Sequence, residues 1–183
     1  MQKIFFYKVS DEHFEKLKTV LETQDIHAYR LSDDCLNEKL STILDHPKDY
    51  DGESVVFGNS YMLVDDVKIG VKKLLDLYRE NDCAYEGITV TKTDTNQDWT
   101  LKYLFTETGK EHELFMRVKH LDECLKECNQ LDLSSFSPGE GLMMKNAMVE
   151  GYLYLKGGKY RIEQLDEIIT MLEEGLKKGS LVN

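Results

Sequence analysis

Two periods of apolar residues alternate along residues 1–113, and together they predict a repeating order of strands and helices. Four short segments rich in apolar residues are too brief for helices and suit strands. These segments lie at 4–7, 26–31, 61–64 and 88–91. Between them, apolar residues recur every three or four positions, as they do in amphipathic helices. The pattern predicts an α/β fold with two βαβα halves, at residues 1–45 and 54–113, that form a mainly parallel sheet.

The two halves align with each other when the chain is shifted so that Phe5 falls on Met62. The same shift places Leu17 on Leu74, and it continues without gaps until Ile26 falls on Cys83. Apolar residues fall on apolar residues, although few are identical. Two interpretations are open. The halves are either an old duplication of one βαβα unit, or two unrelated amphipathic units that share a period and a length.

A polar segment separates the two halves. Residues 45–53 contain one of only two prolines in the chain and form the best predicted linker. After the linker, the apolar segments 55–57 and 61–64 flank Gly58 and Asn59, a pair that favours a tight β-hairpin. We therefore expect the second half to begin with a hairpin.

A second polar segment follows the apolar residues at 88–91. Within it, Asn96 and Asp98 are both good N-cap residues for a helix that carries Leu101 and its apolar neighbours. Gly109 is expected to end or kink that helix, because glycine weakens a helix interior. A separate long helix is then expected from Glu111 onward.

Residues 114–183 predict a helical C-terminal extension. Ser137, Pro138 and Glu140 carry the pattern of a helix start, with a capping serine, a proline in the first turn and a glutamate three residues after the cap. The apolar stripes of the last two predicted helices are broad. A partner protein, or a second copy of the chain, can form the layer that covers them, so a protein partner or a homodimer is expected through these helices.

Composition and charge narrow the range of partners. The 183 residues carry a net charge of −11, and Lys and Arg never occur in runs longer than two. Nucleic acids and anionic membranes bind clustered positive charge, so neither is an expected partner. The chain has no apolar run long enough to span a membrane and no recognisable signal peptide, which predicts a cytoplasmic protein. No cofactor is expected.

The residues around the second polar segment form a recognisable pattern. A Thr-rich strand precedes an Asn and a Trp, and a Glu-His pair follows them. The residues concerned are Thr91 or Thr93, Asn96, Trp99, Glu111 and His112. Over residues 61–113 this pattern resembles a bacterial family known only as a domain of unknown function, number three-seven-eight-three. The resemblance implies a small α/β unit. It implies no reaction or substrate, because the family has no known activity.

Asn96, Trp99 and His112 support two interpretations. In the structural one, Asn96 caps a helix and Trp99 packs that helix against the sheet. In the functional one, the three side chains converge at the carboxyl ends of parallel strands, where such sheets usually bind ligands. An amide, an aromatic ring and an imidazole suit a small polar ligand. The second interpretation predicts a ligand site.

His120, Cys124 and Cys128 are spaced four residues apart on one predicted helix, so they form a row on one face. Imidazole and thiolate groups bind zinc, but a zinc tetrahedron needs a fourth ligand, and no further Cys or His pair has matching spacing. The alternative is that the cysteines are core or surface thiols. We expect free thiols and no metal, with this row as the only candidate.

The chain lacks the sequence motifs of common hydrolases, nucleotide-binding folds and metalloproteases. Together with the broad apolar stripes near the C-terminus, this absence favours a non-enzymatic protein-interaction or regulatory module. The alternative is a small-molecule-binding protein or an enzyme that uses Asn96, Trp99 and His112.

Overall fold

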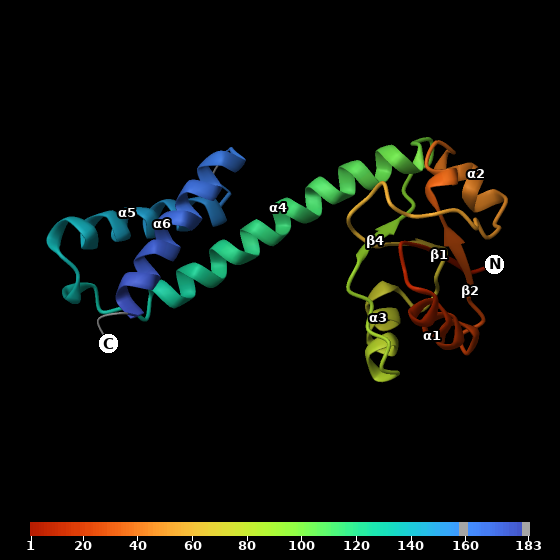
Figure 1. Cartoon of the computed structure of the whole chain (residues 1–183), viewed down its shortest axis with the longest axis horizontal. Coiled ribbons are helices and arrows are strands. Elements are labelled where there is room, and N and C mark those ends of the chain that lie inside the picture. The colour runs from red at the N-terminus through yellow and green to blue at the C-terminus, as the bar shows by residue number, and fades with distance from the viewer. Residues whose placement is uncertain (158–160, 181–183) are drawn as a thin grey trace. The chain divides into compact units, whose positions relative to one another are not determined.

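The computed structural model describes residues 1–157 and 161–180, apart from the side chain of Ser180. The chain folds into two compact units, Met1–Lys110 and Glu111–Asn183, called unit 1 and unit 2 below. Helix α4 (Leu101–Cys128) begins in unit 1 and ends in unit 2 (Figure 1). Glu111 therefore continues a helix that is already under way, and the separate helix expected to begin there does not exist.

Within the described residues, unit 1 holds a four-stranded sheet in the order β2-β1-β3-β4. The strands are β1 (Lys3–Tyr7), β2 (His27–Leu31), β3 (Tyr61–Asp65) and β4 (Ile88–Thr91). β1 pairs with β2, and β3 with β4, in parallel, whereas β1 and β3 are antiparallel. The predicted α/β class, with a mostly parallel sheet and a helical C-terminal region, is confirmed. Because β1 and β3 are antiparallel, the carboxyl ends of β1 and β2 lie at one end of the strands, and the carboxyl ends of β3 and β4 lie at the opposite end.

Helices cover both faces of this sheet (Figure 1). Helices α1 (Asp11–Glu22) and α3 (Val71–Glu80) pack on one face with Ile4, Phe6, Met62 and Val64. Helix α2 (Leu40–Asp45), the short 3-10 helix η1 (Asp33–Cys35) and the beginning of α4 pack on the other face. Strand residues on that second face are Phe5, Tyr7, Tyr61, Leu63, Ile88 and Val90. The core of unit 1 is thus two apolar layers separated by the sheet.

In the helices, residues that the alignment pairs lie on the same face of the sheet, whereas in the first strands the paired residues lie on opposite faces. Leu17 of α1 and Leu74 of α3 are both buried on the same face of the sheet, as the alignment requires. Phe5 and Met62, however, lie on opposite faces, and the residue that shares a face with Met62 is Ile4. A one-residue slip exchanges the two faces of a strand. Placing Ile4, rather than Phe5, on Met62 would pair strand residues of the same face, and the duplication itself remains a prediction.

The polar segment 45–53 is part of unit 1 rather than a free linker. Its backbone follows the outer edge of β2: Tyr50 N donates to Arg30 O at 3.2 Å, and Arg30 N donates to Asp49 Oδ1 at 2.8 Å. Farther along, Asp33 N donates to Glu53 O at 2.8 Å. These bonds satisfy backbone groups that an edge strand would otherwise leave open.

The hairpin predicted around Gly58 and Asn59 does not form, because only Tyr61–Asp65 is a strand there. The amides of Val55 and Val56 donate instead to the carboxylate of Asp33, with Val55 N 2.9 Å from Oδ2. Tyr7 Oη donates to Asp33 Oδ1 at 2.5 Å. Burial acts to raise the pKa of Asp33, but these hydrogen bonds outweigh it, so the pKa is lowered. Asp33 thereby holds the segment around Val55 and Val56 as a loop, where a hairpin strand was expected.

Unit 2 is built from the second part of α4, the 3-10 helix η2 (Leu133–Ser135), α5 (Pro138–Leu155) and α6 (Ile162–Ser180). Its core includes Leu121, Leu125, Met144, Ala147, Leu165, Ile168 and Leu172. Gly151 of α5 lets that helix approach α4 closely, since a Cβ there would lie 3.2 Å from both Leu121 and Leu125. The predicted helix start is confirmed: Ser137 Oγ caps α5 and donates to Glu140 Oε2 at 2.7 Å.

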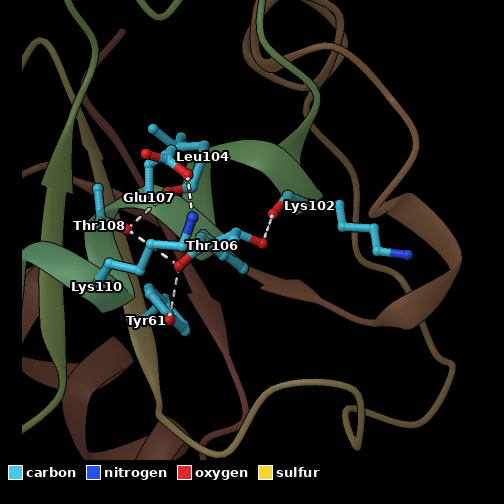
Figure 2. Close-up of polar contacts among 8 residues, drawn as sticks. Tyr61, Lys102, Leu104, Thr106, Glu107, Thr108 and Lys110 are labelled. Atoms are coloured by element: carbon cyan, nitrogen blue, oxygen red, sulfur yellow. Dashed lines mark hydrogen bonds and ion pairs between the residues drawn. The ribbon is translucent and has the colours of Figure 1, made fainter. Parts of the chain in front are cut away.

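The first turns of α4 lie against Tyr61 of β3, and Figure 2 shows the Tyr61 hydroxyl bonded to the backbone of this helix. The rings of Tyr61 and Phe105 stack with centroids 4.0 Å apart, and Tyr61 Oη donates to Phe105 O at 2.9 Å. A Cβ on Gly109 would lie 2.9 Å from the same hydroxyl. Gly109 was expected to end or kink the helix, but α4 continues through it. The glycine is explained by the close approach of the helix to Tyr61.

We expect Gly109→Ala to destabilise the protein, although alanine normally favours a helix over glycine by about 1 kcal/mol. The added Cβ crowds the buried Tyr61 hydroxyl, and overpacking of this kind costs about 1–3 kcal/mol. In a Tyr61→Phe background the hydroxyl is absent, so the same substitution should cost much less. Urea denaturation followed by circular dichroism measures both effects.

Gly139→Ala is the matched control, because a Cβ at this helical glycine of α5 meets nothing within 4 Å. It should leave the free energy of unfolding unchanged or raise it. Equal losses from Gly109→Ala with and without the Tyr61 hydroxyl would contradict the packing explanation.

Candidate functional site

Asn96 organises the turn between β4 and α4. Its side-chain oxygen accepts from Thr93 N at 2.8 Å, and its side-chain nitrogen donates to Thr91 O at 3.0 Å. The residue is buried, with 9% of its surface exposed. Both ends of the amide are thus engaged with the backbone of the same turn. This arrangement is the structural role that sequence reasoning weighed against ligand binding, although the contacts differ from those of an N-cap.

Trp99 and Thr100 join the turn to the start of α4. The Trp99 ring packs against the core and meets Tyr103 edge-on, with centroids 4.7 Å apart. Thr100 Oγ1 accepts from Tyr103 N at 3.3 Å, so Thr100 is the capping side chain, and neither Asn96 nor Asp98 fills that role. The prediction of the cap was therefore wrong by several residues.

The first amides of α4 bond to a distant part of the chain. Leu101 N donates to Glu38 O at 3.0 Å, and Lys102 N donates to Leu36 O at 2.8 Å. These are N–H groups that a helix cannot satisfy internally. The beginning of α4 is therefore completed by the backbone between η1 and α2.

The structure brings Asn96 and Trp99 into one turn, where Trp99 N donates to Asn96 O at 3.0 Å. His112, the third residue of the predicted ligand site, is half-buried and belongs to unit 2. The turn follows β4, so it lies at the edge of the sheet where β3 and β4 end. A ligand site formed by the three side chains remains a prediction.

The opposite edge of the sheet, where β1 and β2 end, carries a cleft of about 560 Å³. Its walls come from the ends of these strands, the first turn of α1 and the segment 50–54, and they include Phe6, Lys8, Ser10, Asp11, Arg30 and Tyr50. Sequence reasoning missed this cleft. Lys8 and Ser10 directly after the first apolar segment, and Arg30 near the end of the second, were the available signal.

Two of the charged side chains in the cleft, Arg30 and Asp11, are paired with each other. Arg30 lies 3.9 Å above the Phe14 ring and forms an ion pair with Asp11, with Arg30 Nη1 2.8 Å from Asp11 Oδ1. Lys8 Nζ donates to Phe57 O at 2.7 Å. The Phe14 ring and the Asp11 carboxylate thus hold the Arg30 guanidinium at the cleft wall, and its side chain stays 27% exposed.

Only part of the predicted row of His120, Cys124 and Cys128 converges. His120 Nε2 lies 3.7 Å from Cys124 Sγ and 2.8 Å from Oε1 of Glu173, a residue of α6. Cys128 is buried and its sulfur faces Leu172 O at 4.0 Å, away from the cluster. Burial raises the pKa of Cys128 to about 11, so it is a protonated thiol.

Helix α5 has apolar side chains on two opposite sides. Its inner side packs in the unit 2 core through Met144, Ala147 and Gly151. Its outer side exposes Leu142, Val149 and Leu153, with 60%, 57% and 49% of their surfaces open. None of the helices in the described part of the chain has both the length and the apolar character that a membrane crossing requires. The outer side of α5 thus presents a row of apolar side chains that no part of the described chain covers.

Comparison of the chain with protein-family models, curated proteins and solved structures finds no match. The resemblance of residues 61–113 to a family of unknown function thus remains a prediction.

We expect Asn96→Ala to lower the free energy of unfolding by about 1–3 kcal/mol, because Thr93 N–H and Thr91 C=O lose their partner in a part-buried turn. Asp94→Ala, at an exposed position of the same turn, is the control and should have little effect. Thermal and urea denaturation measure the difference. A stable Asn96→Ala variant would show that the amide is free for another role.

Proposed function

We propose that this protein is a non-enzymatic interaction module that pairs with a second copy of itself through the outer side of α5. One observation carries the proposal. Helix α5 has apolar residues on two opposite sides, and only one of these sides is covered. Burial of Leu142, Val149 and Leu153 in a dimer would remove this exposed apolar surface from water.

The spacing of the outer residues suits a helix pair. Leu142, Asn146, Val149 and Leu153 follow one another at intervals of four, three and four residues, which is the a/d repeat of a coiled coil. Leu142 and Val149 occupy d positions, and Asn146 and Leu153 occupy a positions. The side of α5 that packs in unit 2 lies opposite this stripe, so the two contacts do not compete.

Two polar features favour a second copy of the chain in parallel orientation as the partner. A single asparagine at an a position selects register and favours pairing with its own counterpart. Lys145 and Glu150 occupy the g position and the following e position, and both are exposed. In a parallel pair, Lys145 of each copy meets Glu150 of the other, whereas an antiparallel pair places g opposite g and e opposite e. The stripe is short, so the dimer should dissociate on dilution.

Unit 1 supports a further proposal about origin. The orders β1-α1-β2 and β3-α3-β4 correspond, and buried residues match when Leu17 is placed on Leu74 in the helices and Ile4 on Met62 in the strands. We propose that the two predicted βαβα halves descend from one duplicated unit. The second copy has one residue fewer between its first strand and its first helix.

Small-molecule binding is the second candidate function, and the cleft at the ends of β1 and β2 supports it. Its volume of about 560 Å³ falls in the range of ligand pockets. Arg30 and Lys8 supply positive charge beside the amino end of α1, and Asp11 and Asp51 line the same cleft, so the lining suits a small polar compound that carries an anionic group. Asn96, Trp99 and His112 define the alternative location that the sequence predicts.

The dimer predicts that Val149→Asp gives a monomer, because a carboxylate in the centre of the stripe would lose its hydration on pairing. Val55→Asp replaces an equally exposed apolar residue of unit 1, with 68% of its surface open, and should leave the dimer intact. Sedimentation velocity over a range of protein concentrations measures the molar mass. A wild-type protein that stays monomeric at all concentrations would refute the proposal.

Orientation is tested by exchanging charges. Lys145→Glu should weaken the dimer by repulsion from Glu150 of the other copy, and the double variant Lys145→Glu/Glu150→Lys should restore it. Each exposed pair contributes only about 0.2–1 kcal/mol, so the dissociation constants are compared at low salt. A double variant as weak as the single one would exclude parallel pairing.

The cleft predicts that an anionic metabolite raises the melting temperature of the protein in a thermal-shift screen. Arg30→Gln should abolish the shift, because it removes the charge from the cleft wall. Arg79→Gln is the control, since Arg79 is an exposed residue of α3 outside the cleft. A shift that survives Arg30→Gln, or no shift with any anionic compound, would count against this second candidate.

A further inference from the structure

A cluster of three different metal-binding groups lies between two helices of unit 2. His120 and Cys124 are on α4, and Glu173 is on α6. One donor atom from each residue lies within 4.8 Å of the other two. Among the residues that the structure describes, this is the single group of three or more potential ligands with such spacing. We propose that it is a binding site for a divalent transition-metal ion, with zinc as the best match.

Distances within the cluster are close to those of a zinc site. Zinc bonds of about 2.0 Å to nitrogen or oxygen and about 2.3 Å to sulfur place tetrahedral ligands roughly 3.3–3.6 Å apart. His120 Nε2 and Cys124 Sγ are 3.7 Å apart, and His120 Nε2 and Glu173 Oε1 are 2.8 Å apart. The 2.8 Å separation is shorter than an ion between the two atoms requires, and the half-exposed Glu173 side chain has room to move outward and admit it.

Backbone geometry supports the convergence. Residues four apart on a helix face the same side, so α4 presents His120 and Cys124 together, and α6 supplies Glu173 from across the interface. Two helices that are already packed hold three ligands in place. Because the helices are joined by the unit 2 core, the arrangement does not have to be created by the ion.

His120, Cys124 and Glu173 all line an open cavity of about 280 Å³, which leaves room for a fourth ligand. Glu123 and Glu127 line this cavity beside the three ligands, and Lys177 contributes the one positive charge among its lining residues. A water molecule or one of these carboxylates can complete the tetrahedron. Three protein ligands with an accessible fourth position are typical of zinc sites that keep an exchangeable ligand.

Electrostatics at the cluster favour a cation. Burial raises the pKa of Cys124, and the negative charges of Glu173, Glu127 and Glu123 raise it further. The same carboxylates attract a divalent ion, which displaces the thiol proton on binding.

The site would join α4 to α6 and stabilise unit 2 in proportion to metal affinity. It differs from the predicted row, because Glu173 takes the place of Cys128. It is also independent of pairing through α5, since none of its ligands lies on that helix. Loss of one property should leave the other intact.

Cobalt(II) is the probe, because a cobalt–thiolate bond gives a charge-transfer absorption band in the near ultraviolet. The full-length protein is stripped with a chelator, kept reduced and titrated with cobalt, followed by zinc. We expect one equivalent of cobalt per chain, a charge-transfer band, loss of the band when zinc displaces cobalt, and a higher melting temperature with zinc.

Variants separate the proposed ligands from their neighbours. Cys124→Ser should remove the band, and Glu173→Gln should weaken cobalt binding at least tenfold. Glu174→Gln changes the exposed carboxylate next in sequence, and Cys128→Ala removes the sulfur of the predicted row; both should retain the band. Circular dichroism confirms that each variant is folded. Glu173 is half-exposed, so its variant tests the proposal even if a cysteine variant is unstable.

The outcomes are decisive in both directions. Stoichiometric binding that depends on Cys124 and Glu173, and not on Glu174, supports the site. Absence of a charge-transfer band at saturating cobalt would overturn it. A band that requires Cys128 but not Glu173 would also overturn it, in favour of the row on α4.

Discussion

The stacking of Phe105 on Tyr61 is the contact on which the architecture depends most. The rings are parallel within 9° and 4.0 Å apart, and the Tyr61 hydroxyl bonds to the backbone of the helix that carries Phe105. The contact fixes the first turns of α4 on β3, the strand that joins both parallel pairs of the sheet through its antiparallel partner β1. The same helix supplies Leu121, Cys124 and Leu125 to the core of unit 2. One helix therefore contributes core residues to both units.

Elements governed by local periodicity could be predicted from the sequence, and features governed by contacts between distant residues could not. The strand segments and the cap at Ser137 follow from apolar spacing and short-range hydrogen bonds. Gly109 was misread because its role depends on Tyr61, which lies on a strand far earlier in the chain. The hairpin failed because the Asp33 carboxylate binds the amides that a strand partner would need. The antiparallel pairing of β1 with β3 also depends on distant residues, because the spacing of the strands along the chain does not determine which strands pair.

The candidate sites likewise contain some residues that local sequence patterns identify and others that only the fold brings together. The sequence could identify His120 and Cys124, because their separation of four residues is a local property of one helix. It could not identify Glu173, since only the packing of α6 on α4 brings that carboxylate to the imidazole. It selected Asn96 by residue type, and the structure shows that the amide bonds within its own turn. The breadth of the apolar stripe on α5 was visible in advance, whereas which residues stay uncovered depends on how α5 packs in unit 2.

The carbonyl groups of Leu36 and Glu38 that receive the first amides of α4 have a consequence for how the protein folds. These bonds close a long loop, and the entropy of closing such a loop must be lost before the bonds compensate for it. The amino-terminal turn of α4 is therefore expected to become ordered late, after the sheet, even though the helix itself consists of local contacts. During synthesis, the segment with Leu36 and Glu38 is made long before α4, so its carbonyl groups stay without these partners until the helix has emerged.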